Sequence, residues 1–88
     1  MATETQEKIE GEIGRCRKGA GEIVVVSVAP FRGRLRLDVR VFWQNDAGEW
    51  LPTRKGVSIG REDCHEFARL VREGVQAIAE RGVASQKA

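Results

Sequence analysis

Hydrophobic and polar residues alternate strictly along the segment RLRLDVRV, residues 34–41. Because successive side chains of a β-strand point to opposite faces of the sheet, this period of two predicts a strand, which we expect to span residues 34–44. One face of that strand is aliphatic, and the other carries arginine. We expect the aliphatic face to pack in the core and the arginine-bearing face to lie in solvent.

Turn residues and β-branched residues around this segment predict further strands. The run EIVVVSV lies between Gly21 and Pro30, and the cluster NDAGEW at residues 45–50 is typical of a hairpin loop. Pro52 cannot donate a hydrogen bond to a ladder, so we expect it to separate two short strands. The expected strands cover residues 22–28, 34–44, 49–51 and 53–59. Four antiparallel strands in chain order form a meander.

The hydrophobic period changes from two to about 3.6 after residue 60. Small and apolar residues then recur at spacings of three and four as far as residue 79, which is typical of one amphipathic helix. Glu62 and Asp63 suit its first turn because the helix dipole favours negative charge there, and we expect Gly82 to end it. The sequence therefore predicts an α+β fold, in which a four-stranded antiparallel β-meander precedes one amphipathic C-terminal helix.

The predicted domain is small, and its sheet is wider than one helix can cover. A helix covers about 10 Å, whereas four strands spaced about 4.8 Å apart span nearly twice that width. We therefore expect a second copy of the chain to cover the remainder, in a homodimer. Residues 1–20 contain few apolar groups, so we expect a flexible acidic and polar arm whose last residues can join the sheet. The domain itself is expected over residues 21–82, with a disordered tail at 83–88.

Several classes of function are disfavoured by the composition. No apolar run approaches the roughly 20 residues that cross a bilayer, and no signal peptide is recognisable. We therefore expect a soluble protein, cytoplasmic and nucleoid-associated in a bacterium or nuclear in a eukaryote. Cys16 and Cys64 are expected to be reduced thiols, and His65 to be an ordinary surface residue. No spacing suits a metal or a catalytic group, so we predict neither an enzyme nor a cofactor.

Positive charge is concentrated in residues 15–40, which hold seven basic side chains against Glu22 and Asp38. Proteins hold single-stranded nucleic acid with a cationic track and with aromatic rings, on which each base stacks for about 1–3 kcal/mol. The segment FRGRLRLDVRVFW, residues 31–43, supplies both features, and TRKG at residues 53–56 adds two more cations. This pattern indicates a nucleic-acid-binding surface.

Two structural alternatives remain open from the pattern alone. The arginines suit equally the solvated face of a half-exposed sheet, where charge also discourages edge pairing. Phe31 and Trp43 suit core positions as well as stacking positions. The alternation groups Trp43 with the aliphatic residues, so an outward-facing Trp43 would require a bulge near Phe42. Trp50, at the end of the expected hairpin, suits a dimer contact.

Three motifs occur in order along the chain. They are F-[KR]-G-[KR] at residues 31–34, D-[IV]-R-x-[FY]-W at 38–43 and G-E-x-x-P-x-R-K-G-[IV]-S at 48–58. With their spacing, over residues 22–80, they resemble the single-stranded-DNA-binding domain of the transcriptional coactivator positive cofactor four and of its bacterial relatives. The resemblance implies a curved β-meander and a homodimer that grips single-stranded DNA or melted duplex with little sequence preference.

By position, the resemblance also implies a set of nucleic-acid-binding residues. Those expected to stack on bases are Phe31 and Trp43. Those expected to contact phosphates or bases, or to complete the channel, are Arg32, Arg34, Arg40, Arg54 and Lys55. The helix is expected to build the dimer interface. Arg36 lies outside the motifs and is interpreted as an ordinary surface charge.

The function we predict is a non-enzymatic, sequence-tolerant single-stranded-DNA-binding protein that acts in transcription, replication or repair. Its expected partners are DNA, a second copy of the chain, and transcription or replication proteins, with no membrane. One alternative is an RNA-binding protein or chaperone, because the same stacking and cationic surface would serve RNA. Another is a dimeric interaction adaptor of the transcription machinery, with the aromatic residues as hot spots.

Overall fold

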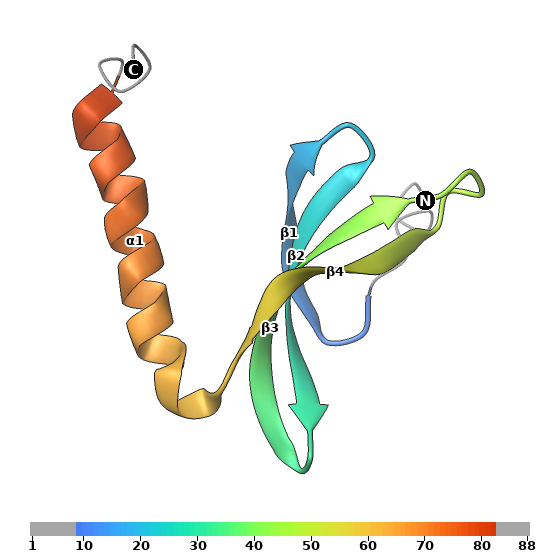
Figure 1. Ribbon diagram of the computed structural model, residues 1–88, viewed down its shortest axis with the longest axis horizontal. Helices are drawn as coiled ribbons and strands as arrows, with labels where there is room; N and C mark the ends of the chain where they lie inside the picture. The colour runs from blue at the N-terminus through green and yellow to red at the C-terminus, as the bar shows by residue number, and fades with distance from the viewer. Residues whose placement is uncertain (1–8, 83–88) are drawn as a thin grey trace.

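The computed structural model describes residues 9–82, which form one antiparallel sheet followed by a helix (Figure 1). The strands lie side by side in chain order as β1 (Glu12–Gly19), β2 (Glu22–Phe31), β3 (Arg34–Gln44) and β4 (Trp50–Ile59). A short 3-10 helix, η2 (Arg61–Asp63), leads into the helix α1 (Cys64–Arg81). The predicted α+β class, with an antiparallel meander and one C-terminal helix, is confirmed.

The expected strand boundaries were wrong at both edges of the sheet. Residues 12–19 form β1 and pair along β2, so a larger part of the expected arm belongs to the sheet than its last residues, which were expected to be able to join it. The two short strands expected around Pro52 are one continuous strand, β4. Both β1 and β4 are edge strands, where exposed positions need no apolar pattern and a proline can direct its missing donor away from the ladder. The expected tail and the first eight residues of the arm lie outside the described residues.

The sheet has two faces, which the continuous register of β2 with β3 defines. The arginine face carries Arg34, Arg36 and Arg40 of β3 together with their β2 partners, Phe31, Ala29 and Val25. The aliphatic face carries Leu35, Leu37, Val39 and Val41 together with Pro30, Val28, Val26 and Val24. Neighbouring side chains on one strand alternate between these faces, and residues paired across two strands lie on the same face. The pairing partners therefore show which residues of β1 and β4 belong to each face.

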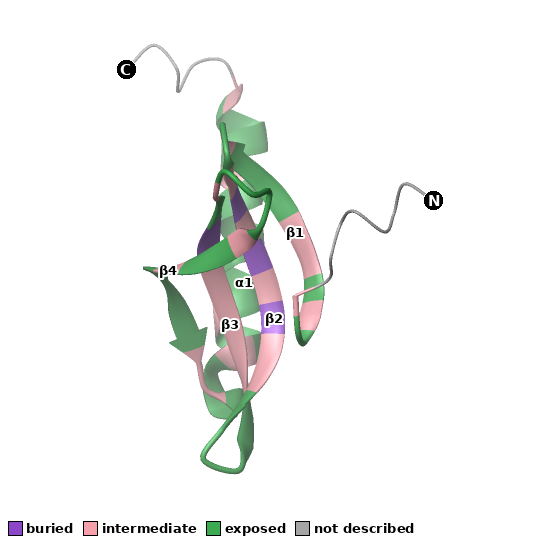
Figure 2. Ribbon diagram, turned by 90° about the vertical axis from the view of Figure 1, so that its right-hand side faces the viewer, coloured by how far each residue is buried: buried purple, intermediate pink, exposed green. Residues whose placement is uncertain are grey.

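The most buried cluster lies on the arginine face, which reverses the expectation from the sequence. Val25 is 1% exposed, and Ile23 and Phe42 are each 8% exposed. Trp50 and Ile9 pack against this cluster from the two edges of the sheet, and Figure 2 shows buried segments along β2 and toward the end of β3. Side chains from the sheet edges therefore cover the arginine face around Ile23 and Phe42, at the end of β2 and β3 opposite the Phe31 hairpin.

The helix α1 leaves its apolar side largely uncovered within the single chain. None of its residues is buried, and Val75 and Ile78 are 63% and 70% exposed. An open groove of about 430 Å³ runs between α1 and the aliphatic face, with Val39 on one side and Phe67 on the other. Figure 1 shows α1 standing beside the sheet instead of lying across it. Within residues 9–82, no helix combines the length and the apolar character that a membrane span requires.

Candidate nucleic-acid interface

The tight turn between β2 and β3 presents Phe31 to solvent. Arg32 and Gly33 have φ angles of 53° and 81°, and they close the pair formed by Phe31 and Arg34. Positive φ at both central residues is characteristic of the type I′ hairpin turn, which matches the twist of the two strands. Phe31 is 56% exposed. The hairpin thus holds an aromatic ring in water at the end of two long paired strands.

Two guanidinium groups lie near the Phe31 ring. The Cζ atoms of Arg32 and Arg36 are 5.1 Å and 6.0 Å from the ring centroid, which is within the range of a cation–π interaction. Arg34 points to the same face, and its Nη1 lies 3.3 Å from Glu62 Oε2 in an exposed ion pair. Such a pair contributes little energy and opens readily, because water screens both charges.

Arg40 is a half-buried cation whose charge is already compensated. Its Nε and Nη2 donate to the two carboxylate oxygens of Asp38 at 3.0 Å and 2.9 Å, and its Nη1 donates to the Thr53 carbonyl at 3.2 Å. The hydrogen bonds to Asp38 raise the pKa of the Arg40 guanidinium above its ordinary value. Arg40 therefore stays charged at every usual pH, but a phosphate would have to share it with a carboxylate.

A bulge in β4 places two further cations beside Arg40. The register of β3 and β4 shifts there, so β4 has extra residues facing β3. The Thr53 hydroxyl donates to the Val41 carbonyl at 2.8 Å and accepts from the Lys55 amide at 3.0 Å, which fixes the shape of the bulge. Arg54 and Lys55 are both exposed on this bulge. Because Arg40 donates to the Thr53 carbonyl, which directly precedes Arg54, the residues Arg40, Arg54 and Lys55 lie in one region of the sheet.

Gly56 ends the bulge at a point where β4 approaches β3 closely. A Cβ atom at this position would lie 2.5 Å from the Val39 carbonyl oxygen and 2.8 Å from the Arg40 Cα. Both distances are shorter than real Cβ contacts, so only glycine allows the two backbones to come this close. The RKG sequence thus combines cations with the glycine that positions them.

Trp43 lies apart from Phe31. The register between β2 and β3 has no irregularity, so Trp43 has the parity of the aliphatic face and pairs with Glu22 on one side and Leu51 on the other. The bulge that an arginine-face orientation would need near Phe42 is absent from β3, and the irregularity is in β4 instead. The tryptophan is nevertheless 44% exposed, so the core position that the pattern also allowed is wrong for the single chain.

The structure therefore divides the predicted site residues into three places. At the hairpin end of the arginine face are Phe31, Arg32 and Arg34. In the middle, around the β4 bulge, are Arg40, Arg54 and Lys55. At the other end of β3, with the opposite parity, is Trp43. Sequence reasoning omitted Arg36, although its alternation with Arg34 already placed both residues on one face.

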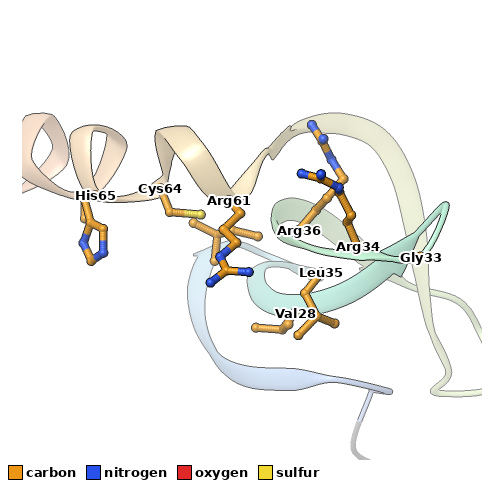
Figure 3. Close-up of a pocket in the computed structure, with 10 residues that line it drawn as sticks. Val28, Gly33, Arg34, Leu35, Arg36, Arg61, Cys64 and His65 are labelled. Atoms are coloured by element: carbon orange, nitrogen blue, oxygen red, sulfur yellow. The ribbon is translucent and has the colours of Figure 1, made fainter.

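Cys64 and His65 lie at the start of α1, whereas the exposed Cys16 lies in β1. Figure 3 shows Arg34 and Arg36 extending to one side of β3 while Leu35 points to the other. A cavity of about 790 Å³ lies here, lined also by Cys64 and His65. The Cys64 thiol is half-buried and donates to the Gly60 carbonyl at 3.3 Å, and both cysteines are free. The part of the chain that the structure describes holds no group of three or more metal-ligating side chains.

Comparison with known proteins agrees with this architecture. The family model of Transcriptional Coactivator p15 (PC4) matches residues 18–70. The crystal structure of a PC4 homologue from Burkholderia pseudomallei, in its orthorhombic form, is 27% identical with a TM-score of 0.65, and the match covers 86% of this chain and 100% of that one. Its tetragonal form is 30% identical with a TM-score of 0.61, over 75% and 93% of the two chains.

A viral protein shows the same likeness. The bacteriophage T5 homologue of the eukaryotic transcription coactivator PC4, a protein implicated in recombination-dependent DNA replication, is 27% identical with a TM-score of 0.56. That match covers 85% of this chain and 83% of the phage protein. Since the family model spans more than half of the sequence and these structures share its fold, this chain belongs to the PC4 family.

Proposed function

We propose that this protein binds single-stranded DNA through its arginine face and acts in transcription or DNA replication, as a DNA-binding protein and not as an enzyme. Membership of the PC4 family and the replication role named for the phage homologue support the biological setting. The single observation that carries the molecular proposal is the exposed Phe31 ring with guanidinium groups 5.1 Å and 6.0 Å from its centroid. An aromatic ring on which a base can stack and cations that can bind phosphate therefore occur together at the hairpin end of the sheet.

In the proposed mechanism, the Phe31 ring and the cationic side chains have separate roles. An unpaired base stacks on Phe31, which is accessible because more than half of the residue is exposed. The phosphates on either side of that base contact arginine side chains, and the exposed Arg54 and Lys55 extend the cationic track across β4. None of these contacts reads the hydrogen-bonding edge of a base, so binding tolerates many sequences.

Trp43 has a different place in the proposal. Its parity separates it from Phe31 within one chain, while its exposure leaves the indole ring free to stack. We therefore include Trp43 as a second stacking residue at the far end of β3. Quenching of its fluorescence by single-stranded DNA, measured against the Trp43→Phe variant, tests this assignment, and equal quenching in both proteins would remove Trp43 from the site.

The proposed assembly is a homodimer, which covers apolar surface that the single chain leaves open. On α1, the large exposed apolar residues are Leu70, Val71, Val75 and Ile78. On the aliphatic face of the sheet, they are Leu35, Leu51 and Val57. Contiguous exposed apolar surface of this kind marks an interaction site in a water-soluble protein. A second copy that covers α1 and the aliphatic face beside it would leave the two arginine faces and the Trp43 end of β3 available for DNA.

The function is tested by anisotropy of a labelled oligo-dT at several salt concentrations. We expect tight binding at low salt that weakens as salt rises, with a log–log slope of about −0.7 for each phosphate contacted. A double variant, Phe31→Ala with Arg34→Ala, should bind much more weakly, since it removes a stacking ring and an exposed cation. Absence of wild-type binding at low salt would refute the proposal. Competition with RNA of the same sequence separates DNA binding from the RNA-binding alternative.

A further inference from the structure

We propose that Arg36, which lies outside the three sequence motifs, is a phosphate-binding residue of the arginine face. It holds the DNA backbone beside the base that stacks on Phe31. This inference rests on the proposed function and adds to it a contact that lies outside the three sequence motifs. It reverses the interpretation of Arg36 as an ordinary surface charge. Three observations carry it: the way in which the guanidinium is held, its charge balance, and its surroundings.

The Arg36 side chain is held in one position by β4. Its Nε donates to the Ser58 hydroxyl at 2.8 Å, and its Nη2 donates to the Ser58 carbonyl at 3.0 Å. A guanidinium has five N–H donors in a planar fork, so three of them remain to donate to a ligand. Because the rotamer is already fixed, a phosphate that binds these donors costs less side-chain entropy than one that binds a freely moving arginine.

Among the three arginines of β3, Arg36 is also the one that forms no ion pair with a carboxylate of the described chain. Arg34 is paired with Glu62, and Arg40 is bound by both carboxylate oxygens of Asp38. Among residues 9–82, no carboxylate lies within ion-pairing distance of Arg36. A phosphate therefore meets an unshared positive charge at this position, whereas at Arg40 it competes with a carboxylate that is already in place.

The surroundings of Arg36 suit a nucleotide. An open cavity of about 470 Å³ on the arginine face is lined by Phe31, Arg36 and Ser58, and also by Arg40 and Asp38. The Arg36 Cζ lies 6.0 Å from the centroid of the Phe31 ring, so a base stacked on this ring places its own phosphate near Arg36.

Arg32 and Arg36 differ in how firmly they are held beside that ring. The Arg32 side chain makes no hydrogen bond to any residue of the described chain, and it can move aside when a base arrives. The guanidinium of Arg36 remains in place because Ser58 holds it. Arg32 is thus the side chain that yields its position to the base, and Arg36 is the fixed cation that receives the phosphate.

A purely structural role predicts different behaviour. If Arg36 served only to join β3 to β4, its loss would lower stability and would leave the salt dependence of DNA binding unchanged. The salt slope reports the number of phosphates neutralised, and stability does not enter it as long as the protein is folded. The slope therefore separates the two roles.

The test compares Arg36→Gln with Arg81→Gln in oligo-dT titrations over a range of salt. Both substitutions remove one positive charge, but Arg81 is an exposed residue in the last turn of α1. We expect Arg36→Gln to bind several-fold more weakly at low salt and to flatten the log–log slope by about 0.7, while Arg81→Gln keeps the wild-type slope. An unchanged slope in Arg36→Gln, or an equal change in Arg81→Gln, would overturn the inference.

A second pair of variants covers the case in which Arg36→Gln folds poorly. Arg36→Lys retains the charge, so it should keep the wild-type slope even if thermal unfolding shows lower stability. Ser58→Ala keeps Arg36 but removes the hydroxyl that fixes it, so binding should weaken with little change in slope. A flattened slope in Arg36→Lys would contradict the proposed role. If the wild type itself does not bind oligo-dT, the proposed function fails, whereas a normal wild type with an unaffected Arg36→Gln removes this inference alone.

Discussion

Asp38→Asn is expected to lower the stability of the protein and to raise its affinity for DNA. Asp38 receives two hydrogen bonds from Arg40, at 3.0 Å and 2.9 Å. The side chains of Arg40 and Asp38 are only 24% and 20% exposed, so the pair is largely shielded from water. Asparagine has a similar shape but no charge, so it weakens the pair and frees Arg40 for a phosphate.

The two expected magnitudes follow from the geometry. Hydrogen bonds to a charged group contribute about 1.5–3 kcal/mol to stability. Partial exposure and the remaining amide oxygen reduce the loss, so we expect Asp38→Asn to lower the free energy of unfolding by about 1–2 kcal/mol. For a domain of this size each kcal/mol lowers the Tm by about 4–8 °C. A phosphate on Arg40 would lie about 6 Å from the carboxylate, where repulsion at an effective dielectric of 20–80 is about 0.7–2.8 kcal/mol. Because Asp38→Asn removes this repulsion, it should tighten oligo-dT binding about 3- to 100-fold at low salt.

The assay pairs thermal unfolding with oligo-dT anisotropy at low salt, and Asp46→Asn is the matched control. Asp46 is exposed in the loop between β3 and β4, so its substitution makes the same change in net charge away from Arg40. Asp46→Asn should leave the Tm unchanged and alter affinity only slightly. If Asp38→Asn binds no more tightly than Asp46→Asn, Arg40 does not contact phosphate. If its Tm is unchanged, the ion pair does not stabilise the fold.

Three other outcomes follow from the structure. Phe31→Ala should weaken oligo-dT binding about 5- to 150-fold, since stacking contributes about 1–3 kcal/mol per base, and an affinity within twofold of wild type would contradict a stacking role. Gly56→Ala should lower the free energy of unfolding by about 1–3 kcal/mol, because the new Cβ would lie 2.5 Å from the Val39 carbonyl oxygen. An unchanged midpoint of urea unfolding would show that β3 and β4 can move apart without loss of stability. Val75→Glu places a charge on the exposed apolar side of α1 and should convert a dimer into monomers in sedimentation velocity, so a dimer unaffected by this change would place the interface elsewhere.

The elements of the fold were accessible from the sequence to different degrees. The alternation over residues 34–41 and the helical period of α1 are local signals, and both elements formed where expected. β1 was expected only in part, as the last residues of the arm, because an edge strand has its backbone paired on one side only and places few demands on its side chains. The prediction of two separate strands around Pro52 was wrong for a related reason, since the missing donor of a proline in an edge strand does not interrupt the ladder.

The candidate site shows the same division. Phe31 and Arg34 belong to one short motif, and they lie together in the structure because they are paired residues across a two-residue turn. Motif spacing could not show that Asp38 already compensates Arg40, since two residues of one strand can share a face without forming an ion pair. Nor could it show the contact between Arg36 and Ser58, which are 22 positions apart and meet only because β3 and β4 pair in this register.

By itself, the sequence determined the strand and helix periods and the presence of arginine on one parity of β3. These features depend on residues close together in the chain, whose side-chain directions follow from backbone geometry. Only the tertiary structure decided which face of the sheet is buried. Trp50 and Ile9 pack from the sheet edges over the arginine face around Ile23 and Phe42, whereas α1 stands beside the aliphatic face. Burial depends on what covers a face, and alternation along one strand carries no information about that cover.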